Sequence, residues 1–283
     1  MTTSRLSRSD PGYPPLLAAI HDPPPQIWLR GPAALELLAQ PAVAIVGARA
    51  CSSYGRAVAR SLGRDLAAAG VVVVSGMARG VDGEAHRGAL EAGGPTVAVL
   101  GCGIDRDYPA AHAELARRIA ENGMIVSEYA PGVEPAPWRF PARNRIISGL
   151  SRAVVVVEAR ERSGALITVD FALDQGREVL VVPGEITSAL SAGSNALLRL
   201  GAAPVLGADD VLEAIGVVVQ RSASVELEGS VGAVLAALSD APATADELAR
   251  ATGLPAAKVA ALLVELELER RVSAEDGIYR CAA

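Results

Sequence analysis

Apolar residues over the first three quarters of the chain recur as short unbroken runs separated by longer amphipathic stretches. The runs predict strands at residues 42–46, 71–74, 95–100, 124–127, 153–157, 178–182 and 204–206. The stretches between them predict helices at residues 33–39, 54–69, 81–92, 110–122, 142–150, 165–175, 194–200 and 209–215. Because the strand runs are continuous and do not alternate, each strand should be covered on both faces. Such strands alternating with helices predict an α/β fold, a doubly wound, Rossmann-like parallel sheet.

Segments outside this alternation indicate how the chain divides. Residues 1–32 carry seven prolines and are predicted to form an extended Pro-rich leader. Within it, a short helical turn is expected near residues 16–20 and a strand-like end at residues 26–30. The Rossmann-like domain is predicted to span residues 33–216, and a linker is predicted over residues 217–229.

Residues 230–283 have a pattern of their own. It predicts helices at 231–238, 244–252 and 255–269 and short strands at 272–273 and 278–280. Thr244, followed three residues later by Glu247, is a capping box. Three short helices and a hairpin predict a small C-terminal winged helix-turn-helix domain. Residues 221–283 hold six basic and ten acidic residues, which favours a protein-contact or regulatory role over reading a DNA groove.

Composition limits the classes of function. The net charge is -6 and the pI is about 5.2, so any nucleic-acid binding must come from a local basic patch. The three cysteines are far apart without a CxxC pair, and the three histidines lack metal spacing, which indicates reduced thiols and no metal site. No signal peptide and no apolar run of ~18 residues is recognised, so a cytoplasmic protein is expected.

No catalytic arrangement is recognised either. A Ser/His/Asp set, a GxSxG elbow, a Walker A loop and a paired-carboxylate site are all missing from the sequence. Asp82 and His86 are close enough for a catalytic role to be considered. Asp82 near a helix start is better explained as a cap or dipole partner, to which His86, four residues on, could bond. The sequence therefore predicts binding without turnover: not an enzyme, and no catalytic residue, metal or cofactor.

The stretch from Trp138 to Ser148 combines rare aromatic residues with arginine. The chain has two tryptophans and two phenylalanines, and one of each, Trp138 and Phe140, flanks Arg139. Residues 138–162 contain six arginines against two carboxylates. Arginine forks bind phosphate oxygens bidentately, and a flat aromatic ring stacks on an unpaired base. A solvated basic helix face would explain the charges alone, but the aromatic residues favour a nucleic-acid-binding stretch.

Glycines and arginines also follow the predicted strands. The strand ends carry Gly47-Ala48-Arg49, Ser75-Gly76-Met77-Ala78-Arg79 and, further on, Ser163-Gly164. Ligands of open parallel sheets bind beyond the carboxyl ends of the strands, where glycines and helix N-termini suit phosphate groups. The absence of GxGxxG argues against an ordinary NAD enzyme. A tight turn explains each glycine singly, but together with the arginines these ends predict a polyanion site.

Several motifs, taken together and in order, closely resemble the DNA-processing protein A (DprA, or Smf) family. They are Tyr13-Pro14 with the Asp22-Pro23-Pro24 leader, Val46-Gly47-Ala48-Arg49, Ser75-Gly76-x-Ala78-x-Gly80-Val81-Asp82, Phe140-Pro141-x-Arg143-Asn144-Arg145-Ile146-Ile147-Ser148, Ser163-Gly164-Ala165-Leu166-x-Thr168 and Val182-Pro183-Gly184. The resemblance covers about residues 11–215, and the winged helix resembles a domain that many members carry. It implies a cytoplasmic protein that binds and protects single-stranded DNA taken up in natural transformation, loads RecA recombinase onto it and forms a homodimer.

The resemblance also maps the family's DNA pocket onto this sequence. The implied pocket residues are Arg49, Ser75, Gly76, Phe140, Arg143, Asn144 and Arg145, with Arg139 as a neighbour. Arg49, Arg143 and Arg145 are expected to hold successive phosphates while Phe140 stacks on a base. Arg79, Ser163 and Gly164 complete the candidate nucleic-acid site. A helical domain that many members have ahead of the leader is not recognised here, so either its role is absent or the start site of the sequence is wrongly assigned.

Two other functions remain open at this point. Nucleotide-hydrolysing enzymes of the lysine-decarboxylase-like type, which release a base from a nucleoside monophosphate, resemble this chain in strand order. They carry PGGxGTxxE, whereas the nearest stretch here, residues 163–170, has no Gly-Gly pair. The other hypothesis is a nucleotide sensor that acts through the winged helix. The homodimer is expected to form through the late sheet edge, near residues 196–198 and 204–206.

Overall fold

The structure is a computed structural model that describes residues 3–32, 35–217, 229–269, 271–275 and 277–281. The chain divides into two compact units, Met1–Val219 and Gln220–Ala283. The predicted linker, residues 217–229, lies almost entirely outside the described residues. Each unit is described below by itself.

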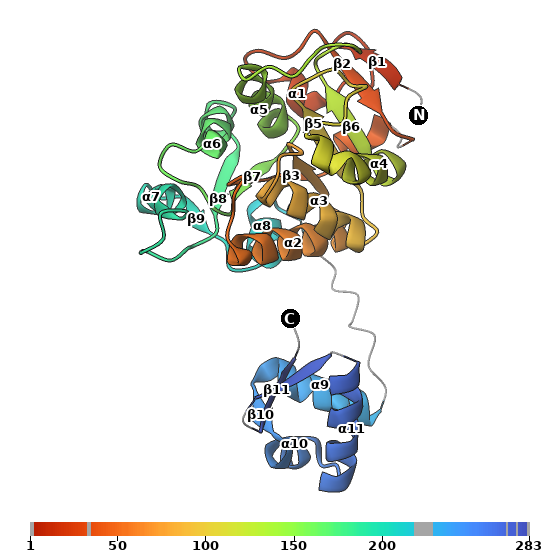
Figure 1. Cartoon of the computed structure of the whole chain (residues 1–283), viewed down its shortest axis with the longest axis vertical. Coiled ribbons are helices and arrows are strands. Elements are labelled where there is room, and N and C mark those ends of the chain that lie inside the picture. Colours follow the sequence, from red (N-terminus) through yellow and green to blue (C-terminus); the bar gives the residue numbers. More distant parts are fainter. Residues whose placement is uncertain (1–2, 33–34, 218–228, 270, 276, 282–283) are drawn as a thin grey trace. The chain divides into compact units, whose positions relative to one another are not determined.

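The larger unit is built on a nine-stranded sheet with strand order β1-β2-β6-β5-β4-β3-β7-β8-β9 (Figure 1). Its strands are β1 (Thr3–Ser7), β2 (Gln26–Arg30), β3 (Ala42–Val46), β4 (Val72–Ser75), β5 (Thr96–Leu100), β6 (Met124–Ser127), β7 (Ala153–Val156), β8 (Glu178–Val181) and β9 (Ala203–Pro204). Neighbouring strands from β6 to β9 pair in parallel, while β1 and β2 are antiparallel. The predicted doubly wound, Rossmann-like sheet is confirmed.

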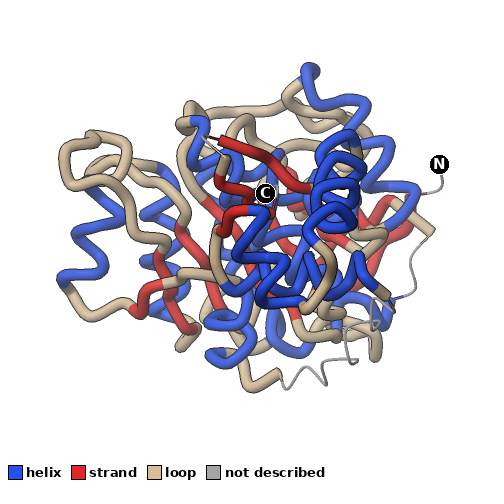
Figure 2. Tube along the Cα trace, turned by 90° about the horizontal axis from the view of Figure 1, so that it is seen from below, coloured by secondary structure: helices blue, strands red, loops and turns tan. Residues whose placement is uncertain are grey.

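Helices cover both faces of this sheet (blue beside the red strands in Figure 2). They are α1 (Pro15–Ala18), η1 (Leu35–Ala39), α2 (Ser53–Ala68), α3 (Val81–Glu91), η2 (Ala110–His112), α4 (Ala113–Asn122), α5 (Arg139–Gly149), α6 (Gly164–Asp174), α7 (Ala192–Arg199) and α8 (Ala208–Ala214). Along β3, Ala44 and Val46 pack with α5 and α6, whereas Val43 and Ile45 pack with α2, α3 and α8. Coverage of both faces explains why the strand runs are continuously apolar.

The N-terminal segment is more ordered than an extended leader. β2 and α1 lie at the predicted strand-like end and helical turn, but no strand is predicted before residue 26. In the structure β1 pairs with β2, and β2 pairs with β6, so the segment completes one edge of the sheet. β1 escapes prediction because Leu6 is its only large apolar residue and its only buried one.

The smaller unit has its own apolar core and a three-stranded sheet of order β10-β12-β11. Its elements are α9 (Ser230–Asp240), β10 (Ala243–Thr244), α10 (Ala245–Thr252), α11 (Ala256–Leu268), β11 (Val272–Glu275) and β12 (Ile278–Cys281). The predicted capping box is present, since Thr244 Oγ1 accepts from Glu247 N and Glu247 Oε2 accepts from Thr244 N. Three helices and this small sheet form a winged helix. Across the described residues of both units, no helix is long and apolar enough to cross a membrane.

Candidate functional site

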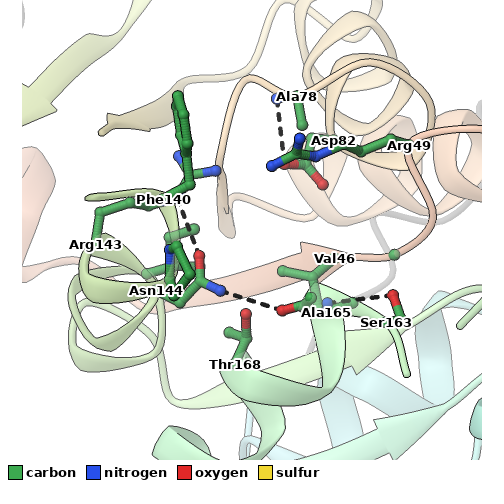
Figure 3. A pocket seen from close by; sticks show the side chains of 14 residues that line it. Val46, Arg49, Ala78, Asp82, Phe140, Arg143, Asn144, Ser163, Ala165 and Thr168 are labelled. Atoms are coloured by element: carbon green, nitrogen blue, oxygen red, sulfur yellow. Dashed lines mark hydrogen bonds between the residues drawn. The ribbon is translucent and has the colours of Figure 1, made fainter. Parts of the chain in front are cut away.

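A crevice opens where the direction of the sheet connections changes. β3 and β7 are neighbours, but the chain runs from β3 outward to β4, β5 and β6 and from β7 outward to β8 and β9. Open parallel sheets bind ligands at the carboxyl ends of the strands at such a point. The crevice here has a volume of about 330 Å³. Its walls come from the end of β3, the start of α3, α5 and the N-terminus of α6 (Figure 3).

A second cavity of about 260 Å³ adjoins the crevice and is called the side pocket below. The two share Arg49, Ala78, Phe140 and Arg143 in their walls. The side pocket is completed by residues that follow β4 and β5. These are Gly76, Arg79, Leu100, Gly101, Cys102, Tyr108 and Pro109, together with Ala50. Crevice and side pocket therefore form one continuous depression across the strand ends.

Arg49 and Arg79 supply exposed positive charge to this depression. The loops that carry them are in close contact, because Val81 N donates to Ala48 O at 3.2 Å. Gly80, with φ of 76°, permits this approach, since a Cβ there would overlap the carbonyl oxygen of Ala48. Neither arginine forms an ion pair with a carboxylate of the described chain. Both guanidinium groups are exposed to an anionic ligand, while the charge of Arg49 also opposes the rise that burial causes in the pKa of the Asp82 carboxyl.

Phe140 stands between the crevice and the side pocket. Its ring stacks on Tyr108 with centroids 5.3 Å apart, and Arg49 Cζ lies 5.6 Å from its centroid. Tyr108 is a half-exposed aromatic residue that is not predicted as a site residue, because it is isolated in a loop after β5. The two stacked rings, with one guanidinium beside them, thus form an aromatic platform at the opening.

Trp138 and Arg139 lie outside both cavities. Arg139 Cζ is 4.8 Å from the Trp138 ring centroid and 5.0 Å from that of Tyr129, and its Nη1 donates to Glu134 O. Arg139 is therefore next to the pocket residue Phe140 in sequence, but Arg139 itself lines neither cavity. Its guanidinium is held between two aromatic rings at the start of α5.

Arg143 is buried in the wall that the crevice and the side pocket share, and the donors on its Nε and Nη1 atoms are already used. Its Nη1 donates to Gly76 O at 2.5 Å and to Val99 O, and its Nε donates to Asn144 Oδ1 at 3.0 Å. Burial lowers the pKa of Arg143 to about 10, although the nearby Asp82 carboxylate opposes the shift. Gly76 is required here, since a Cβ would overlap the Arg143 guanidinium. These contacts make Arg143 a support for the strand-end loops, and its expected role as a phosphate ligand stays a prediction.

Arg145 also has a different place from the one expected. Its guanidinium pairs with Glu128 at 2.5 Å and with Asp22 at 3.1 Å, and it lines neither cavity. The reason is helical geometry: two residues along α5 turn the side chain away from the side occupied by Arg143. Arg145 fastens the N-terminal segment to the sheet.

Ser75 likewise lines neither cavity. Its buried hydroxyl donates to Ile45 O at 2.6 Å, which ties β4 to β3. The expectation that Ser75 contacts the ligand is therefore replaced by a structural role. Gly76, next in sequence, does line the side pocket.

The N-terminus of α6 opens onto the crevice. Ser163 is its N-cap and accepts from Ala165 N at 3.3 Å, while a Cβ added to Gly164 would meet nothing within 4 Å. Asn144 Nδ2 donates to Gly164 O at 3.3 Å and so joins α5 to this turn. Ser163, Gly164 and Asn144 line the crevice. A helix N-terminus that lines a cavity favours a bound anion.

Asp82, in the first turn of α3, lies in the wall of the crevice and is buried. It accepts from Ala78 N at 3.2 Å. Burial raises its pKa, and the nearby Arg143 acts against that shift. Its first-turn position agrees with the expected dipole role. In the described part of the chain, no group of three or more His, Cys, Asp or Glu side chains could hold a metal ion.

His86 bonds Thr96 and not Asp82, contrary to expectation. Thr96 Oγ1 donates to Val73 O at 2.6 Å, so it accepts from His86 Nδ1–H at 2.7 Å. The buried Nε2 of His86 then has no partner within the described structure. Burial, with smaller effects from His112 and nearby arginines, lowers the pKa of His86 to about 3.

This burial predicts acid sensitivity. The unfolded chain protonates His86 near pH 6.5, while the folded chain keeps it neutral down to about pH 3. The contribution of His86 to the free energy of unfolding is therefore fully present above pH 6.5 and is lost as the pH falls toward 3. Between pH 7 and pH 5 we expect a loss of about 2 kcal/mol in the free energy of unfolding. Urea titrations of wild type and His86→Gln measure this, with exposed His21→Gln as control. An equal pH dependence in wild type and His86→Gln contradicts it.

Comparison with known proteins places these features in a family. The family model described as DNA recombination-mediator protein A matches residues 4–216, and the DprA winged helix domain matches residues 218–277. The chain is similar to the putative DNA processing protein DprA of Mycobacterium tuberculosis, with 45% identity over 90% of this chain and 68% of the relative. It is similar to the DNA processing protein DprA of Streptococcus pneumoniae, with 44% identity over 72% of this chain and 71% of the relative.

Two solved structures are similar to three quarters of this chain. The X-ray structure of Streptococcus pneumoniae DprA has a TM-score of 0.71 and 42% identity, over 75% of this chain and 74% of that one. Helicobacter pylori DprA, whose structure describes a single-stranded DNA binding mode, has a TM-score of 0.68 and 31% identity, over 75% of this chain and 95% of that one.

Proposed function

Because this chain belongs to the DNA recombination-mediator protein A (DprA) family, we propose that it binds single-stranded DNA across the crevice and the side pocket. One observation carries the proposal. Two arginines without carboxylate partners in the described chain, Arg49 and Arg79, flank an aromatic platform of Phe140 and Tyr108 at the sheet's switch point.

The chemistry of the walls suits a single strand. Arg49, Arg79 and the N-terminus of α6 favour phosphate groups, and Phe140 with Tyr108 favours an unpaired base. Arg143, Asn144 and Gly76 hold this surface in shape from below, and Arg145 and Ser75 act through the fold. Duplex DNA should bind much less well, because paired bases do not reach the rings.

The proposal extends to the role of the bound strand. We propose that the protein protects single-stranded DNA in the cytoplasm and loads RecA recombinase onto it during natural transformation. The family assignment and the strand-end surface support this extension. A recombination mediator must hold the strand without base pairing and pass it on, which an open depression of this kind permits.

A homodimer through the late sheet edge is part of the proposal. β9 is the last strand of the sheet, and Leu200 and Leu206 on either side of it are 84% and 86% exposed. Ile186, in the loop after β8, is 95% exposed. Large apolar side chains gathered at a sheet edge fit a protein interface. Light scattering at tens of micromolar should give the dimer mass, and Leu200→Asp with Leu206→Asp should give the monomer.

Fluorescence anisotropy tests the central proposal. A labelled oligothymidine should bind the full chain much more tightly than a duplex of the same length. Adding the protein to that strand should shorten the lag of RecA filament assembly. Equal affinity for duplex and single strand contradicts the proposal. Release of free base from AMP, without oligonucleotide binding, supports the lysine-decarboxylase-like alternative.

Phe140→Ala should weaken binding without changing its salt dependence. We expect a loss of roughly 1–3 kcal/mol, because stacking on a base releases no counterions. Tyr108→Ala should behave in the same way. Trp138→Ala is the matched control, since Trp138 is an exposed aromatic two residues away that lines neither cavity. Two results would show that the platform does not bind a base. One is a shallower slope of log affinity against log salt in Phe140→Ala, and the other is an equal loss of affinity in Trp138→Ala.

A further inference from the structure

The third helix of the winged-helix unit has two apolar faces. Val259, Leu263 and Leu266 of α11 are buried in the core of the unit. On the opposite side of the helix, Ala257, Ala261, Val264 and Leu268 are exposed. Val264 is 56% and Leu268 80% exposed, so this second face is uncovered in the single chain. We call these four residues the outer stripe.

The spacing of the outer stripe is that of a helix-pairing seam. Successive members are four, three and four residues apart, which places them in one line along a helix. Two helices pair through apolar positions repeated in this way. A single exposed leucine needs no explanation, but four aligned apolar positions on a helix that already has a buried face do.

The charges beside the stripe do not fit DNA. Glu265 lies along one edge of the stripe and Glu267 along the other, and Lys258 is the only basic residue of α11. Phosphate groups would be repelled by this face. A protein partner is therefore the better match.

We propose that α11 pairs with α11 of a second copy of this chain, antiparallel and about a two-fold axis. This arrangement sets Ala257 against Leu268 of the second copy and Ala261 against Val264 of the second copy. Each small side chain then meets a large one along the whole seam. A parallel pair would instead oppose alanine to alanine and leucine to leucine, which leaves gaps at one end and crowding at the other.

Charge complementarity supports the same arrangement. A two-fold rotation keeps each edge of the stripe on the same side of the pair. Lys258 and Glu265 share one edge, so Lys258 faces Glu265 of the second copy, and the reverse contact is made as well. Within the described part of its own chain, neither side chain has an ion pair. An antiparallel pair therefore gains two cross-helix ion pairs.

The contact is small and should act between copies that are already close. α11 has 13 residues, and a pair of such helices buries less than a standard protein interface. Copies held side by side, on one polymer or in one oligomer, reach a high effective concentration, at which a weak contact forms. The inference does not depend on what the crevice binds.

Cysteine cross-linking of the full chain tests the pairing. The exposed Cys281 is first replaced by serine, while the buried Cys51 and Cys102 remain. Ala257→Cys and Leu268→Cys are then combined in one chain. The two positions are about 16 Å apart within one helix, so a disulfide between them can form only across two copies. We expect covalent dimers on oxidation from the double variant and almost none from either single variant.

Charge reversal in this double-cysteine background separates self-pairing from other contacts. Lys258→Glu and Glu265→Lys should each slow cross-linking by about fivefold, because each makes one edge uniformly charged. Combined, they should restore the rate to within about twofold, since the opposite charges face each other again. All these positions are exposed, and circular dichroism checks the fold. Absent covalent dimers, or no rescue by the combined reversal, overturns the proposal.

Discussion

The double variant Arg49→Ala with Arg79→Ala will bind oligothymidine far more weakly than wild type and with a shallower salt dependence. Each phosphate neutralised on a single strand contributes about -0.7 to the slope of log affinity against log salt. Losing both contacts should therefore make the slope shallower by about 1.4. Hydrogen bonds to charged groups are worth about 1.5–3 kcal/mol, so each arginine should cost roughly tenfold or more in affinity.

The physical basis is that these two arginines combine exposure with the absence of a carboxylate partner in the described structure. Arg49 also lies over the Phe140 ring and acts on the buried Asp82 carboxylate, so a urea titration of the variant accompanies the binding measurement. Arg118→Ala is the matched control, because Arg118 is an exposed arginine on α4 that lines neither cavity. Arg49→Lys should keep most of the slope, since it keeps the charge. Wild-type affinity in the double variant would remove the phosphate contacts from this surface.

The architecture could be predicted from the sequence because most strands are recognisable as runs of apolar residues. Runs such as Ala42–Val46 and Val72–Ser75 are apolar at every position or nearly so, and only a sheet covered on both faces needs that. β1 could not be predicted, because it has no such apolar run. It lies at the sheet edge, and only Leu6 is buried, so its sequence carries almost no pattern.

The location of the site could also be predicted, but the roles of the individual residues could not. Strand-end glycines and arginines mark the crevice because the carboxyl ends of parallel strands meet there. The spacing of the arginines along the sequence does not show which of them is bonded to other parts of the folded chain. Arg143 and Arg145 lie two residues apart, yet one is buried against Gly76 and Val99 and the other pairs with Glu128. Partners distant in sequence decide between a ligand contact and a structural one.

Arg143→Met should therefore lower stability strongly. The substitution leaves the carbonyl oxygens of Gly76 and Val99 without their donor and the buried Asp82 carboxylate without its nearby cation. Removing one partner from a buried charged group costs about 3–5 kcal/mol. Urea titration followed by tryptophan fluorescence reports this unit alone, because Trp28 and Trp138 are the only tryptophans and both lie within Met1–Val219.

A second substitution distinguishes this role from a phosphate contact. Asp82→Asn added to Arg143→Met removes the uncompensated carboxylate, so the two changes together should cost less than the sum of their separate costs. Under conditions where Arg143→Met remains folded, its salt slope for oligothymidine should match wild type, because no phosphate contact has been lost. A slope shallower by about 0.7 with unchanged stability would instead place Arg143 on the DNA backbone and reverse its assignment here.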